Sequence, residues 1–171
     1  MGRSTFSGPV ESLAGFISAG ISNSVTTAVS RTLDVANFAG KQIYYTSTAA
    51  ATFTLPAVNS TSPSDPTDPN QDNNYGATFD FVLSTTVTGN FVVQVANASD
   101  TMVGTAIFGS GTTALVFSTA TASDTITLNG TTTGGVGGAT VTATVVGANR
   151  YKVNVVSGAT GAVATPFSAA V

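Results

Sequence analysis

Short runs in which apolar and polar residues alternate dominate the chain from Gln42 onward. In ATFTL, at residues 51–55, Ala51, Phe53 and Leu55 share one side and two threonines share the other. Side chains of a β-strand point alternately to its two faces, so this period of two predicts half-buried strands. The same pattern recurs at residues 77–83, 91–95, 124–128, 140–146 and 151–155, with expected inward residues Ala77, Phe79, Phe81, Leu83, Phe91, Val93, Val95, Ile126, Leu128, Val141, Ala143, Val145, Tyr151, Val153 and Val155.

The segments between these runs are rich in glycine and asparagine, which supply the backbone angles that tight turns need. The sequence Gly147-Ala148-Asn149 separates two strong runs and predicts a hairpin. The fold class expected from this pattern is all-β: an antiparallel β-sandwich, jelly-roll-like, with about eight strands. No clean internal repeat is visible, so a solenoid is not expected.

The first 41 residues lack the alternating pattern, and we interpret residues 1–41 as an extended N-terminal arm ahead of a sandwich domain over residues 42–171. Its apolar residues fall at near-helical spacing, although Gly15 and Gly20 weaken any helix. One interpretation is a short helix or loop packed on the body. The favoured one is an arm that docks on a partner, through Leu13, Phe16, Ile17 and Ile21.

Three later segments also depart from the strand pattern. Residues 59–74 hold three prolines and three aspartates and predict a long exposed loop. Residues 131–138, TTTGGVGG, predict either a flexible linker or a close approach of backbones. In the tail, residues 157–171, we expect Phe167 to fill a groove on its own subunit or on a neighbour, which makes it a fifth candidate docking residue.

The composition argues against catalysis. The chain of 171 residues has no His and no Cys, and only 8% of its residues are charged. It therefore lacks the commonest general base, metal ligand and thiol nucleophile. A net charge of -3 and scattered basic residues argue against a nucleic-acid partner. The apolar stretch at residues 13–29 is too interrupted for a membrane span or a signal peptide, so no membrane partner is expected.

The remaining titratable groups form no catalytic motif. Neither Lys41 nor Lys152 has the setting of a serine–lysine dyad. Asp80 is the only carboxylate in the middle of a strong strand, and a polar sheet face explains it better than a glycosidase pair. Calcium binding by the acidic loop is less favoured than a solvated loop, because the spacing of Asp65, Asp68 and Asp72 matches no calcium motif. No catalytic residue, metal or cofactor is therefore predicted.

The stretches GATFDFVL, GNFVVQVA, MVGTAIF and DTITLNGTTTGGVGGATVTATVVGANRYKVNV resemble β-sandwich domains of tailed-bacteriophage virions, above all head decoration (cement) proteins. The resemblance covers roughly residues 42–167 and rests on strand pattern and composition. It implies a non-enzymatic protein on the outer surface of the capsid that bridges subunits of the major capsid protein. It also implies a homo-oligomer, with a trimer favoured over a dimer.

A second function class stays open: a phage tail or fibre domain that binds a host receptor or glycan. The loops at residues 59–74 and 131–138 would form its site. Tyr75, beside the acidic loop, is the evident exposed aromatic residue for stacking on a sugar.

Overall fold

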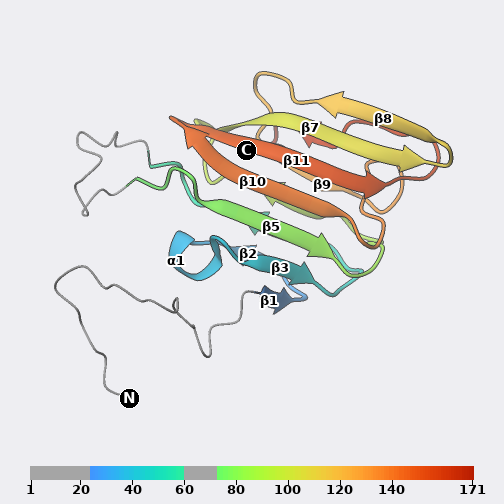
Figure 1. The fold of residues 1–171 in the computed structure, drawn as a ribbon, viewed down its shortest axis with the longest axis horizontal. Coiled ribbons are helices and arrows are strands. Elements are labelled where there is room, and N and C mark those ends of the chain that lie inside the picture. Colours follow the sequence, from blue (N-terminus) through green and yellow to red (C-terminus); the bar gives the residue numbers. More distant parts are fainter. Residues whose placement is uncertain (1–23, 60–72) are drawn as a thin grey trace, which may run out of the picture.

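The computed structural model describes residues 24–59 and 73–171, which form two packed β-sheets (Figure 1). Seven strands make one sheet, in the order β1-β3-β5-β10-β11-β7-β8. Their bounds are Ser24–Thr27 (β1), Gln42–Tyr45 (β3), Thr78–Leu83 (β5), Thr101–Ser110 (β7), Thr113–Ser118 (β8), Thr140–Gly147 (β10) and Arg150–Gly158 (β11). The other sheet has the order β12-β9-β6-β4-β2. Its strands are Arg31–Thr32 (β2), Ala51–Thr54 (β4), Phe91–Gln94 (β6), Thr125–Leu128 (β9) and Phe167–Ser168 (β12). The predicted all-β sandwich is confirmed.

The first six strands alternate between the two sheets, so the chain winds through three stacked coils. β1, β3 and β5 pair in parallel in one sheet, and β2, β4 and β6 do so in the other. Inward residues of successive coils stack in columns, such as Val25, Ile43 and Phe81. This is the winding of a short solenoid, which the sequence did not predict because the coils differ in length and residue pattern.

The strand pairing corrects two details of the predicted sandwich. Five pairings among the described strands are parallel rather than antiparallel: β1 with β3, β3 with β5, β2 with β4, β4 with β6, and β7 with β11. The described strands also number twelve rather than about eight. Very short strands such as β2 and β12 hold too few positions to show a period.

The sandwich starts before the boundary expected at Gln42. β1 and β2 are the edge strands of the two sheets, and Leu33, directly after β2, is only 3% exposed. The short helix α1 (Val35–Phe38) then leads to β3, capped by Asp34, whose carboxylate accepts from the N–H of Asn37 at 2.8 Å. Hydrogen bonds from Asn37 lower the pKa of the Asp34 carboxyl. Residues 24–41 therefore belong to the body of the sandwich.

The core lies between the sheets and contains an aromatic cluster from both. Tyr45 and Phe81 come from the seven-stranded sheet, and Phe53 and Phe91 come from the five-stranded one. Ring centroids lie 5.3 Å apart for Phe53 and Phe81, and 5.2 Å apart for Tyr45 and Phe91. The predicted inward residues are buried, with Ala77 packed at the margin of the core.

The hairpin expected at Gly147-Ala148-Asn149 is confirmed. It joins β10 to β11 in antiparallel pairing, and Asn149 has the positive φ of 55° that a tight turn favours. Among the described residues, no helix has the length and apolar run needed to cross a membrane.

Candidate functional site

The outward face of the seven-stranded sheet carries a continuous row of mostly apolar side chains. Strand register places one residue from each strand in this row. We call it the apolar ladder; in order across the sheet it consists of Thr26, Tyr44, Val82, Thr140, Val156, Ile107 and Val116. Val116 is 61% exposed, Val156 53% and Ile107 44%. A contiguous group of exposed apolar residues is typical of a protein contact surface.

A second row, the polar ladder, lies two residues away along each strand. It consists of Ser24, Gln42, Asp80, Thr142, Asn154, Thr105 and Ser118. The Thr142 hydroxyl donates to Oδ1 of Asp80 at 2.7 Å. In the next row, the hydroxyls of Thr78 and Thr144 lie 2.9 Å apart. These cross-strand hydrogen bonds restrict the side chains of Thr78, Thr142 and Thr144, so this part of the face is ordered before any partner binds.

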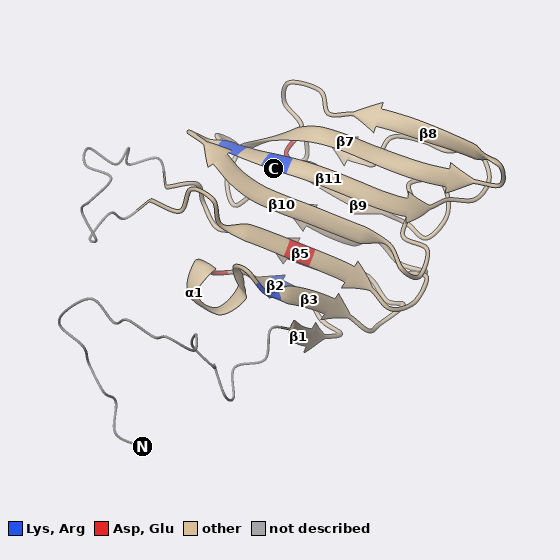
Figure 2. Cartoon of the chain, viewed as in Figure 1, with Lys and Arg blue, Asp and Glu red and all other residues tan. Residues whose placement is uncertain are grey.

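The face carries little charge, and Figure 2 shows that charged residues are few among all the described residues. Asp80 is the only charged residue of the two ladders. Lys152 lies in the row of Thr144, and Arg150 stands at the start of β11. A partner that covers the ladders therefore desolvates few charges.

The outward face of the five-stranded sheet is chemically different. Its cross-sheet row is entirely polar: Thr32, Thr54, Gln94, Thr125 and Ser168. The apolar ladder thus distinguishes one face of the sandwich from the other. We identify that face as the candidate functional site.

Two aspartates at strand ends, Asp100 and Asp124, are buried. Asp100 is 2% exposed, and it accepts from the Val58 N–H and the Asn97 amide. Asp124 is 5% exposed, and it accepts from Thr125 and from the backbone of the last two residues. Both carboxylates connect segments that are distant in sequence. Composition alone did not reveal this role, because Asp is also the usual residue of exposed turns.

The described residues show no cluster of three metal-ligating groups. The Tyr151 hydroxyl donates to the Pro56 carbonyl at 2.6 Å. Burial, with a contribution from the negative charge of Asp100, raises the pKa of Tyr151. The Tyr151 hydroxyl therefore keeps its proton and serves as a structural hydrogen-bond donor. The acidic loop residues Asp65, Asp68 and Asp72 lie outside the described residues.

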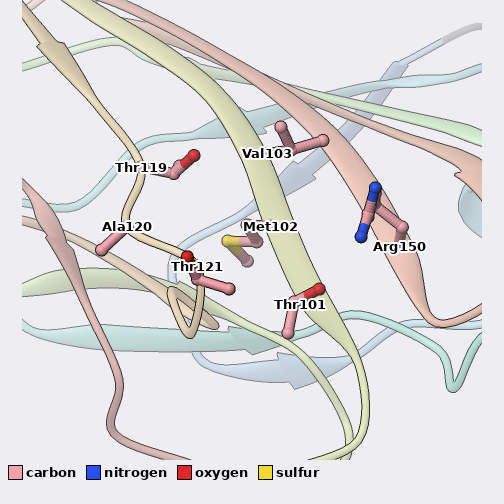
Figure 3. A pocket seen from close by; sticks show the side chains of 7 residues that line it. All are labelled: Thr101, Met102, Val103, Thr119, Ala120, Thr121 and Arg150. Carbon is pink, nitrogen blue, oxygen red and sulfur yellow. The ribbon is translucent and has the colours of Figure 1, made fainter.

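A shallow polar pocket of about 240 Å³ lies beside β7 (Figure 3). Arg150 stands on one side of β7, and the segment after β8 stands on the other. The lining residues are Thr101, Met102, Val103, Thr119, Ala120, Thr121 and Arg150. A second pocket, of about 260 Å³, is lined by Ser30, Arg31, Thr32, Thr52 and Thr54. Hydroxyls with one guanidinium can hold a polar ligand, but neither lining includes a carboxylate to act as an acid or base.

Of the five predicted docking residues, Phe167 is the one that lies among the described residues. Phe167 lies in β12 opposite Ile126 and is only 8% exposed, so it fills a groove on its own subunit. The other four candidates, Leu13, Phe16, Ile17 and Ile21, lie outside the described residues. Alternation within single strands did not reveal the ladders, because finding them requires the register between strands.

Two features of the proposed glycan site, Tyr75 and residues 131–138, lie among the described residues. Tyr75 is partly buried and packs against the core. In residues 131–138, Gly134 and Gly135 are buried, and the Gly135 N–H donates to the Ser157 hydroxyl at 2.8 Å. This segment is a close approach of backbones rather than a flexible linker. Residues 60–72 of the other loop lie outside the described residues.

No protein-family model, curated protein or solved structure matches this chain.

Proposed function

We propose that this chain is a non-enzymatic structural protein of a virion, which decorates a tailed-bacteriophage capsid and stabilises it by bridging subunits of the major capsid protein. The apolar ladder carries the proposal. A broad sheet face with exposed apolar side chains and one carboxylate suits burial against another protein.

The chemistry of the described residues supports a binding role over a catalytic one. The buried carboxylates accept hydrogen bonds from backbone and side-chain donors of their own chain. Neither Lys41 nor Lys152 lines either of the two pockets. Together with the sequence resemblance, this favours a role on the outer surface of the capsid.

Bridging requires each decorating unit to contact more than one capsid subunit. An oligomer achieves this through multivalency, because the second contact forms at a high effective concentration after the first. The proposal therefore assigns two contacts to the protein. The apolar ladder serves oligomerisation, and the N-terminal arm with Leu13, Phe16, Ile17 and Ile21 serves the shell.

Decoration-free capsids mixed with the purified protein test the proposal directly. We expect ordered density at fixed positions of the lattice by cryo-electron microscopy. Deletion of residues 2–23 should abolish that density while preserving the circular dichroism spectrum. The deletion stops before Ser24 because β1 begins there. Capsids that stay bare with the full chain would contradict the proposal.

The pocket beside β7 favours a second candidate, a tail or fibre domain that binds a glycan. Three threonine hydroxyls and the Arg150 guanidinium can hydrogen-bond a saccharide, with Met102 as an apolar floor. A glycan array tests this, with R150A as the variant expected to lose any hit. Copy number per virion, measured by mass spectrometry, separates the candidates: hundreds of copies indicate the shell and a handful indicate the tail.

A further inference from the structure

We propose that the apolar ladder is covered by the same face of a second copy, related by a two-fold axis that runs along β10. The inference deepens the proposed function and rests on it, since it names the partner of the face already assigned to oligomerisation. It replaces the trimer implied by the sequence resemblance with a dimer.

β10 is the middle strand of the sheet, with three strands on each side. A two-fold axis along β10 therefore places each strand opposite its counterpart on the other side: β5 opposite β11, β3 opposite β7, and β1 opposite β8. Such an isologous contact requires that residues at equal distances from β10 complement each other.

The apolar ladder meets that requirement. Val82 and Val156 flank Thr140 of β10 at equal distance, so each valine would face the other valine of the second copy. One strand further out, Tyr44 would face Ile107. At the edges, Thr26 would face Val116. Every apolar side chain of the ladder then meets a side chain with an apolar surface.

The polar ladder is matched in the same way. Asp80 and Asn154 flank Thr142, so each carboxylate would face an amide and not another carboxylate. Oδ1 of Asp80 accepts from Thr142, and Oδ2 has no hydrogen-bond partner among the described residues. The Asn154 amide also has none there. The two-fold brings this unused acceptor and unused donor together, twice in each dimer.

The charged side chains of the face are also compatible with this two-fold axis. Lys152 and Thr78 flank Thr144 in the next row, so each ammonium would face a threonine. No like charges meet in these three rows. The face is thus electrostatically complementary to itself, which is the property that favours a second copy over an unrelated partner.

The size of the face suits a reversible dimer. At about 4.8 Å by 6.8 Å per outward residue, the two seven-residue ladders and the four-residue row of Thr78, Thr144, Lys152 and Val103 cover about 590 Å². Two such faces bury about 1,200 Å² in total, the lower limit for specific interfaces. Sheets that pack face to face lie about 10 Å apart, with strand directions within about 30°. Because the strands of the two copies can cross at such an angle, facing residues are best aligned close to the axis. These residues are Val82, Thr140 and Val156, on β10 and its two neighbours.

Sedimentation velocity of the full chain over a wide concentration range tests the dimer. We expect a monomer–dimer equilibrium that V156D weakens at least about a hundredfold, because two charges are buried against valine. V29D is the matched control: Val29 is 59% exposed, lies outside both ladders and should leave the equilibrium unchanged. A monomer at all concentrations, or a dimer unaffected by V156D, would overturn the inference.

Swapping the side chains at positions 80 and 154 tests the position of the two-fold axis. N154D should weaken the dimer about tenfold or more, because each new carboxylate faces Asp80 of the second copy. D80N/N154D should restore affinity to within about threefold of wild type, because the amide and the carboxylate exchange places. Failure of this rescue would overturn the two-fold assignment.

Shell binding distinguishes this inference from the proposed function. A dimer that leaves capsids bare contradicts decoration and retains the two-fold contact. Suppose instead that the protein is a monomer, that it decorates capsids, and that V156D abolishes the decoration. The apolar ladder would then contact the capsid shell rather than a second copy, which would overturn the inference.

Discussion

The carboxylate of Asp124 accepts a hydrogen bond from the backbone N–H of Ala170, with 2.8 Å between oxygen and nitrogen. The same carboxylate accepts from the Thr125 hydroxyl and from the N–H of Val171. A buried side chain thus holds the C-terminal tail beside β9, where β12 adds a strand to the sheet.

Removal of this carboxylate should be costly. D124A leaves three donors without their acceptor in a site that is 5% exposed, and we expect a loss of about 2–4 kcal/mol in the free energy of unfolding. Denaturant unfolding measures it. D34N is the control, because Asn caps a helix as well as Asp does and should change stability by only a few tenths of a kcal/mol. A loss below about 1 kcal/mol for D124A would contradict this account of the tail.

Phe167 should affect stability rather than partner binding. Its ring is buried in its own subunit, so F167A should lower the free energy of unfolding by about 2–4 kcal/mol through the cavity it leaves. V171A, at a residue 39% exposed in the same tail, should change it by less than about 0.5 kcal/mol. Shell affinity, measured below the unfolding transition, should be the same for F167A and wild type. Weaker shell binding by folded F167A would instead assign Phe167 to docking.

The sequence predicted the buried side of the strong strands because burial is a property of each strand by itself. Phe79, Phe81 and Leu83 stand at every second position of β5 and lie inward, as expected. The hairpin at Asn149 was predictable for a similar reason, since turn chemistry is local. Fold class therefore followed from local patterns alone.

Pairing and the candidate site depend on register between strands that are distant in sequence. Parallel and antiparallel neighbours give the same alternation, so the coils of β1 to β6 were not predicted. The ladder combines Tyr44, Val82 and Val156, which no single segment places together. The polar role of Asp124 was missed because two of its three donors lie 46 and 47 residues away.

Tyr151 should give the protein an alkaline stability limit. Burial raises the pKa of its hydroxyl, so above about pH 10 the unfolded chain loses this proton before the folded chain does. The contribution is fully present below the unfolded pKa and is lost as the pH rises from there toward the folded pKa. Unfolding free energies measured between about pH 9 and pH 12 should fall more steeply for wild type than for Y151F.

The same variant separates the proton effect from the lost hydrogen bond. At neutral pH, Y151F should lose about 1 kcal/mol, because the Pro56 carbonyl loses its donor. Equal alkaline slopes for the two proteins would show that the Tyr151 proton does not control this limit.

Two glycines with nearly the same backbone angle should respond very differently to alanine. Gly130 has φ +78° and Gly76 has φ +80°, so any side chain pays a similar conformational cost at both. A Cβ at Gly130 would overlap the carbonyl oxygen of Val87, whereas one at Gly76 would meet nothing within 4 Å. The pair therefore isolates the steric contribution of the close approach at residues 130–138.

We expect G76A to lose about 1–2 kcal/mol in unfolding free energy, the cost of a left-handed alanine. G130A should lose at least about 4 kcal/mol or fail to accumulate as folded protein, because backbone must move to relieve the overlap. Denaturant unfolding and circular dichroism of the two variants provide the comparison. Stabilities within about 1 kcal/mol of each other would show that residues 130–138 can move away from Val87, and so act as the flexible linker that their glycine content first suggested.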